Sequence, residues 1–236
     1  MMKSSLSETK KKLLVECIQR GLALHRMNVE TSGLIERNAL GLWALNYIFG
    51  EARKLDSDFE IFAFKRGPFS TVFLYDAETE SIINFISKQN LKRLDNRGVV
   101  DKTHYADALV LYNKKIYDEP QQLCIFEEES KSDQRQIIQQ QIEFAIMEKK
   151  PKQHLFVVYD IDHKGFQLRG VFGAARSEHY YPIFDENWSK YILIDIDDLN
   201  GVDSSNAPYN NFGTESKKAR LGIKIKREFD ITHKDK

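Results

Sequence analysis

Several common features are missing from this 236-residue chain. It has no run of 18 apolar residues and therefore no candidate for a transmembrane helix. The first residues lack the apolar segment of a secretory signal. Its two cysteines, Cys17 and Cys124, are too few for a cysteine-based zinc site, and their apolar surroundings predict buried thiols. We therefore expect a protein of the reducing cytoplasm, with no membrane insertion.

Three well-known catalytic patterns are also missing. There is no Gly-x-x-x-x-Gly-Lys-Ser/Thr loop, which argues against a P-loop ATPase, and no Gly-x-Ser-x-Gly elbow of the kind found in α/β-hydrolases. The six histidines are scattered, and none forms a His-x-His pair with an apolar spacer. The two-histidine metal site of tyrosine relaxases is therefore not predicted.

Charge is balanced over the whole chain but unevenly distributed along it. The 35 basic and 35 acidic residues give a net charge of zero. Basic residues are in excess over 1–100 and 214–236, whereas acidic residues dominate 101–213. This layout suits a protein that contacts a polyanion near its ends and holds cations in its middle, although a randomly clustered solvated surface explains it equally well.

The first third of the sequence predicts two helices and a hairpin. Apolar residues recur with a helical period over 8–25 and again over 36–54. Phe59–Phe64 and Thr71–Tyr75 are rich in aromatic and β-branched residues, and a Lys-Arg-Gly-Pro turn joins them. This order is typical of a winged helix-turn-helix, so we expect a DNA-binding domain over 1–77. The alternative is a helical cap and hairpin with no nucleic-acid role.

The remaining residues, 78–236, predict a mixed α/β domain. A helix is expected over 78–95, a strand over Ala106–Tyr112, and a second strand beginning at Leu123–Phe126. A long helix over Asp133–Lys149 and a buried strand over Leu155–Tyr159 follow. Further strands are expected over Gly165–Phe172 and Tyr191–Ile196.

One group of charged residues has the pattern of a metal-dependent nuclease. Asp107 opens one expected strand, and Glu129-Ser130-Lys131 follows at the end of its expected partner. Because side chains alternate along a strand, Glu127, Glu129 and Lys131 would share one face. Carboxylates that hold Mg²⁺, with an ammonium group nearby, are what phosphodiester hydrolysis requires.

The Glu-x-Lys pattern is weak alone and needs its context. It also occurs at Glu8/Lys10, Glu148/Lys150 and Glu215/Lys217, but only Glu129/Lys131 follows an expected apolar strand. Three consecutive acids beside a strand are costly to pack unless a cation neutralises them. The competing interpretation is an exposed strand end with solvated charges. His104 could line the site or lie on the surface.

The segments His104–Val110 and Phe126–Lys131 resemble those of the PD-(D/E)XK nuclease superfamily, and within it the plasmid replication-relaxation and MOBC mobilisation relaxases. The resemblance implies a restriction-endonuclease-like core preceded by a winged helix. It also implies that Asp107 and Glu129 bind the metal and that Lys131 is the electrostatic catalyst, with His104 and Glu127 as accessory residues. Ala106 stands where the superfamily motif has proline.

These observations predict a DNA endonuclease that uses Mg²⁺ or Mn²⁺. The expected substrate is a plasmid transfer origin, nicked on one strand, with accessory mobilisation or coupling proteins as possible partners. The alternatives are a restriction-type endonuclease that cuts both strands and a DNA-binding regulator with an inactive nuclease fold. Basic residues of the first domain are the expected phosphate contacts: Arg37, Arg53, Lys54, Lys65 and Arg66.

Overall fold

The computed structural model describes residues 4–32, 40–66, 69–97, 104–116, 129–147, 149–162 and 167–193. All of them belong to the first of two compact units, Met1–Leu199 and Asn200–Lys236. Their helices are α1 (Glu8–Ser32), α2 (Leu40–Ala52), α3 (Lys88–Arg97), α4 (Tyr105–Leu109) and α5 (Glu129–Ala145), with 3₁₀ turns η1 (Val110–Lys115) and η2 (Ser189–Tyr191). Their strands are β1 (Glu60–Arg66), β2 (Phe69–Asp76), β3 (Ser81–Ser87), β4 (Gln153–Ile161), β5 (Leu168–Arg176) and β6 (Pro182–Asn187).

The strands form one mixed sheet in which spatial order follows chain order, β1 to β6. All neighbouring pairs are antiparallel except β3 and β4, which are parallel and align Ser81 with Gln153 and Ser87 with Tyr159. A parallel pair requires the intervening chain to cross from one end of the sheet to the other. Residues 88–152, which include α3, α4 and α5, make this crossing.

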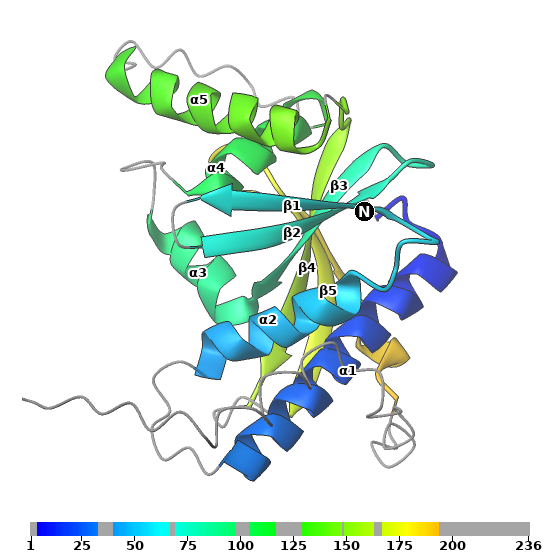
Figure 1. Cartoon of the computed structure of the whole chain (residues 1–236). Coiled ribbons are helices and arrows are strands. Elements are labelled where there is room, and N and C mark those ends of the chain that lie inside the picture. Colours follow the sequence, from blue (N-terminus) through cyan, green and yellow to red (C-terminus); the bar gives the residue numbers. More distant parts are fainter. Residues whose placement is uncertain are drawn as a thin grey trace, which may run out of the picture. The chain divides into compact units, whose positions relative to one another are not determined.

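Helices cover both faces of the sheet (Figure 1). One face packs against α1 and α2, with Leu74, Ile83 and Val157 among the residues of that core. The other face packs against α3, α4 and α5, with Phe73, Ile82 and Phe156 among its residues. The inner strands are therefore buried on both sides, and they read in sequence as nearly continuous apolar runs.

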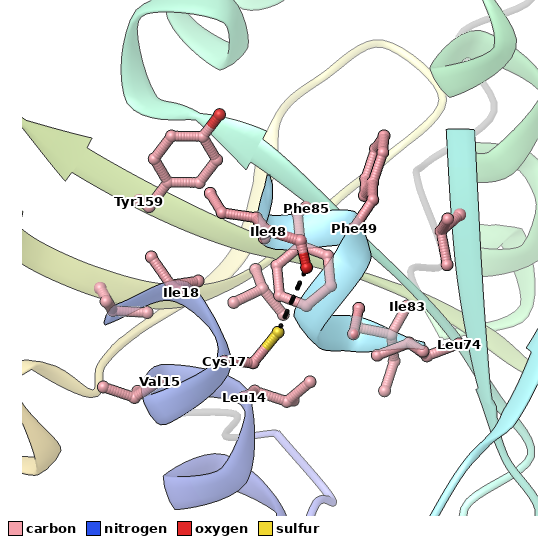
Figure 2. Close-up of a cluster of buried hydrophobic side chains, with 14 of the residues drawn as sticks. Leu14, Val15, Cys17, Ile18, Ile48, Phe49, Leu74, Ile83, Phe85 and Tyr159 are labelled. Carbon is pink, nitrogen blue, oxygen red and sulfur yellow. Dashed lines mark hydrogen bonds between the residues drawn. The ribbon is translucent and has the colours of Figure 1, made fainter. Parts of the chain in front are cut away.

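The contact between α1 and α2 is close because Gly21 lies against Ile48. A Cβ added to Gly21 would meet the backbone nitrogen and Cα of Ile48 at 2.7 Å. One helical turn earlier, the Cys17 thiol donates to the Ile48 carbonyl oxygen at 3.5 Å, as Figure 2 shows. Burial raises the pKa of this thiol. Cys17 is a free, buried cysteine, as expected, whereas Cys124 lies outside the described residues.

Much of the expected secondary structure is confirmed. The helices expected at 8–25, 36–54 and 133–149 correspond to α1, α2 and α5, and the hairpin corresponds to β1 and β2. The strands expected at 155–159 and 165–172 correspond to β4 and β5. The mixed α/β class is therefore correct.

The expected helix over 78–95 is wrong in its first half. Ser81–Ser87 form β3, and only the following residues, from Lys88, are helical. Ile82 and Ile86 face one helical layer while Ile83 and Phe85 face the other. A strand buried on both sides shows no alternation, so its pattern cannot be told from that of a buried helix.

The expected strand over Ala106–Tyr112 is wrong as well. Its residues form α4 and the 3₁₀ turn η1. Ala106, Ala108, Leu109 and Val110 are all buried, so this run has no exposed side from which to read a period. Alanine and leucine also have high helix propensity, which agrees with the observed state.

At the end of the described chain, the strand expected at Tyr191–Ile196 is wrong where it can be compared. Tyr191 closes η2, and residues from 194 lie outside the described ranges. The expected strand at Leu123–Phe126 also lies outside them. β6, Pro182–Asn187, was not expected from the sequence at all, and β3 was expected as part of a helix.

The winged-helix domain is not confirmed. Its two helices and hairpin exist, but the hairpin supplies the first two strands of the six-stranded sheet, and β2 pairs directly with β3. The expected boundary between residues 77 and 78 falls between these two paired strands. Within the described ranges, no helix combines the length and apolarity needed to cross a membrane.

Candidate functional site

The first candidate site surrounds Asp107, which lies in α4 and is fully buried. Its Oδ2 accepts a hydrogen bond from the backbone nitrogen of His104 at 2.8 Å, which closes a capping box at the start of the helix. Its Oδ1 accepts a hydrogen bond from the hydroxyl of Tyr180 at 2.6 Å. Both carboxylate oxygens are therefore engaged within the fold.

His104 is the N-cap residue of α4. Its Nδ1 accepts from the backbone nitrogen of Ala106 at 3.2 Å, and its ring lies 4.3 Å from the ring of Tyr105. The first turn of this short helix is thus stabilised by two side chains, those of His104 and Asp107. Both residues were predicted as site residues, and the structure places them next to each other.

Tyr180 comes from the turn between β5 and β6. Ser177 Oγ accepts from the backbone nitrogens of His179 and Tyr181, and Tyr180 has a φ of 65°, a left-handed conformation. This turn directs the Tyr180 hydroxyl onto Asp107, whereas Tyr181 is 60% exposed. No pattern in the sequence joins Tyr180 to Asp107, because the two residues are 73 positions apart.

Further charged groups lie on the same turn. Glu178 Oε2 is 3.9 Å from the Lys114 ammonium of η1, and Glu178 Oε1 is 3.5 Å from His179 Nε2. The neighbouring Arg176 is buried and pairs with Asp185 at 2.7 Å. The β5–β6 turn therefore contacts the α4–η1 segment at two points, through Tyr180 with Asp107 and through Glu178 with Lys114.

Glu129 and Lys131 lie in the first turn of α5 and not on a strand. The expectation that they occupy the end of a strand paired with Ala106–Tyr112 is therefore wrong. The alternation that predicted a shared face belongs to strands and does not apply to a helix. The side chains of Glu129 and Lys131, and the whole of Glu127, lie outside the described part of the structure.

The described residues can be searched for a group that would bind a metal ion. Among the described residues, no group of three or more His, Cys, Asp or Glu could hold a metal ion. Asp107 offers one carboxylate, and each of its two oxygens already accepts a hydrogen bond from within the protein. The described residues alone therefore do not make up a metal centre.

The expected phosphate contacts are dispersed. Arg53 and Lys65 are exposed, and Lys54 donates to Glu51 at 2.6 Å. Arg66 is the last residue of β1, but its side chain lies outside the description, as does all of Arg37. Of the described members, Arg53 and Lys54 follow α2, and Lys65 lies near the far end of β1.

A buried polar network connects η1 with the centre of the sheet. Asn113 donates to the carbonyl oxygens of His154 and Arg176 at 3.0 and 2.9 Å, and its Oδ1 accepts from the His154 backbone nitrogen at 2.7 Å. The His154 ring contacts Asn84 Oδ1 through Nε2 at 2.7 Å. Burial lowers the pKa of His154 to about 3, so this ring is neutral at physiological pH.

A surface hollow of about 500 Å³ lies beside the outer part of α5. It is lined by Tyr112, Gln140, Glu143, Phe144, Lys149, Lys150 and Pro151. Burial, followed by the charge of Glu143, raises the pKa of Tyr112. Asp107 does not line this hollow, which makes it a separate feature from the first site.

Comparison with protein families matches residues 3–236 to the profile of a family of unknown function, DUF5986. The chain is a member of the DUF5986 family. The match includes α1 to α5 and all six strands, so the sheet and the Asp107 cluster of this DUF5986 protein fall within the family region. Neither a curated protein nor a solved structure matched the chain.

Proposed function

We propose that this protein is a cytoplasmic, metal-dependent DNA endonuclease, and specifically a mobilisation relaxase that nicks a plasmid transfer origin. The supporting observation is that α4, which carries Asp107, packs against α5, the helix that begins with the Glu129–Lys131 segment. Leu109 of α4 and Ile138 and Ile142 of α5 belong to the apolar cluster that joins the two helices. A mixed sheet with helices on both faces is also consistent with the nuclease fold that the resemblance of the motif implies.

In this proposal, Asp107 and Glu129, with Glu127, hold Mg²⁺ or Mn²⁺. The bound ion would supply positive charge at the attacked phosphate, and Lys131 would add to it. His104 and Tyr180 act as positioning residues for Asp107, because the His104 backbone N–H and the Tyr180 hydroxyl each donate a hydrogen bond to its carboxylate. Arg37, Arg53, Lys54, Lys65 and Arg66 are proposed as phosphate contacts, with accessory mobilisation or coupling proteins as further partners.

Supercoiled plasmid tests the enzymatic proposal directly. Wild-type protein with Mg²⁺ or Mn²⁺ should convert it to nicked circles, and Glu129→Ala and Lys131→Ala should each abolish the conversion. Glu143→Gln is the matched control, because Glu143 lies on the same helix and should be dispensable for cleavage. Linear product would instead support a restriction-type enzyme that cuts both strands.

A second candidate is a DNA-binding regulator with an inactive nuclease fold. The observation in its favour is that both oxygens of Asp107 already serve the fold, as helix cap and as acceptor for Tyr180. A carboxylate used in this way needs no metal to justify its burial. This candidate predicts DNA binding that weakens with salt, measured by fluorescence anisotropy, without metal-dependent cleavage. A protein that neither binds nor cleaves DNA would contradict both candidates.

A further inference from the structure

Over residues 136–147, where the structure describes the side chains, the exposed residues of α5 and of the turn after it are uncharged, and the charged Glu143 is half-buried. Ile137 is 52% exposed, Phe144 is 84% exposed, and Met147, just after the helix, is 77% exposed. Between them lie Gln140 and Gln141, which are also exposed. We call these five residues the α5 strip. Its members recur at spacings of three, four and seven residues, which places them along one side of a helix.

This composition is unusual for a helical face in contact with water. Such faces normally carry charges, as α3 does through exposed Lys88, Lys92 and Arg93. Within 136–147, by contrast, every exposed residue is either apolar or glutamine, although 30% of the chain is charged. The opposite side of α5 packs into the core through Ile138, Ile142 and Ile146. The helix is therefore suited to burial on two sides.

We propose that the α5 strip is an interface at which two copies of this chain associate, with their α5 helices antiparallel about a two-fold axis. An axis between Gln140 and Gln141 places Ile137 of each copy against Phe144 of the other. Gln140 of each copy then meets Gln141 of the other. A glutamine amide has both a donor and an acceptor group, so these side chains can pair with copies of themselves.

The absence of charge among the five residues of the α5 strip favours a second copy of the chain over other binding partners. It has no cationic side chain to meet a phosphate backbone, and its two central glutamines are unsuited to a lipid interior. An uncharged face meets its own copy without like-charge repulsion. The hollow beside the strip is lined by Gln140 and Phe144 and also by Glu143, Lys149 and Lys150, so charges of both signs flank the strip and the hollow offers room for a polar side chain from the second copy.

The size of the helix sets the expected strength of association. Seventeen residues of α-helix span about 25 Å, so an α5 pair buries less than the roughly 800 Å² per partner of a standard interface. We therefore expect a reversible dimer in the micromolar range, which requires measurement at about 1–100 µM.

Sedimentation equilibrium of the full chain tests the proposal. Wild type should dimerise, and Phe144→Glu or Ile137→Glu should weaken association at least tenfold, because each places two carboxylates within the apolar contact. Met27→Glu is the matched control, since Met27 is 48% exposed on α1 and should not affect association. A wild type that stays monomeric, or a dimer that both α5 variants leave unchanged, would overturn the proposal. A monomer that binds a different protein or DNA through the strip would also contradict the proposal.

Disulfide cross-linking tests the orientation of the helices. Gln141→Cys lies beside the proposed axis and should cross-link to its own copy under mild oxidation. Gln136→Cys should not, because the two copies of residue 136 would be about 13 Å apart along the helix axis. The parent chain, with Cys17 and Cys124, provides the background. Cross-linking at 136 in preference to 141 would exclude the antiparallel arrangement.

Discussion

Asp107 receives hydrogen bonds from two parts of the chain that are distant in sequence, α4 and the β5–β6 turn. Replacing Tyr180 with phenylalanine keeps the ring and removes the donor to Oδ1. The buried carboxylate then has fewer donors, and we expect a loss of about 1–3 kcal/mol in the free energy of unfolding. Urea denaturation measures it, and Tyr181→Phe, at an exposed position, should change stability little. Equal stability of Tyr180→Phe and wild type would show that this bond contributes nothing net.

Asn113 satisfies three backbone groups at once. Asn113→Ala would leave two carbonyl oxygens and one N–H of the sheet without their partner, because the site is fully buried. At about 1–3 kcal/mol for each unsatisfied group, we expect a loss of at least about 3 kcal/mol, measured by urea denaturation. Asn90→Ala, on the exposed side of α3, is the control and should cost little. A small loss at Asn113 would mean that water replaces its bonds.

His154 predicts a dependence of stability on pH. Its pKa is about 3 in the folded protein because the ring is buried, against about 6.5 in an unfolded chain. Below about pH 6.5 the unfolded state binds a proton that the folded state does not. The contribution of His154 to stability is therefore complete above that pH and falls as the pH drops toward 3, by up to about 1.4 kcal/mol per pH unit.

A His154→Gln variant isolates this effect. It should be less stable than wild type at pH 7, and the difference should narrow between pH 7 and pH 5, because only wild type has this titrating group. His25, whose pKa is also lowered by burial, remains in both proteins and cancels in the comparison. A difference that stays constant over this range would contradict the expected shift.

At the scale of elements, Gly21 of α1 and Gly50 of α2 should respond in opposite ways to alanine. Gly21→Ala would force its Cβ to within 2.7 Å of the Ile48 backbone, so the helices must separate, at a cost of about 1–3 kcal/mol. A Cβ at Gly50 meets no atom within 4 Å, and alanine is the better helix former, so Gly50→Ala should stabilise by up to about 1 kcal/mol. Thermal unfolding of both variants tests this, and similar shifts would contradict the close helix contact.

The sequence predicts elements well where one side faces solvent. In α1, buried Leu14, Ile18 and Leu22 recur every four residues while Lys12 and Arg20 are exposed, so its helical period is visible. Prediction failed at Ser81–Ser87 and Ala106–Val110, where neighbours cover the chain on all sides. An apolar run that is buried on every side has no period, so local sequence does not distinguish a strand from a helix there.

The candidate site shows the same limit. Sequence reasoning selected Asp107 and His104, which the structure places together, but on a helix and not a strand. The contribution of Tyr180 depends on a turn 73 residues away, with a left-handed residue that is not a glycine. No local pattern indicates such a contact, because it arises from the pairing of β5 with β6.

At the scale of the whole molecule, the continuous sheet predicts how the chain behaves when it is cut into two fragments. Because β2 pairs with β3 and the α1–α2 core includes residues from both sides of position 77, fragments 1–77 and 78–199 should each fail to fold alone. Circular dichroism of the separate fragments should show no cooperative thermal transition, whereas the full chain should show one. Two independently folded fragments would establish the two-domain organisation expected from the sequence.

The parallel pairing of β3 with β4 also bears on synthesis in the cell. The meander β1–β2–β3 can form early, but its inner edge, Ser81–Ser87, has no neighbour until the ribosome has released residues 153–161. During that interval a strand with the sequence SIINFIS presents unpaired backbone groups and isoleucine and phenylalanine side chains. A nascent chain stalled between these points would expose a hydrophobic strand edge, the kind of surface that chaperones bind and on which aggregates begin.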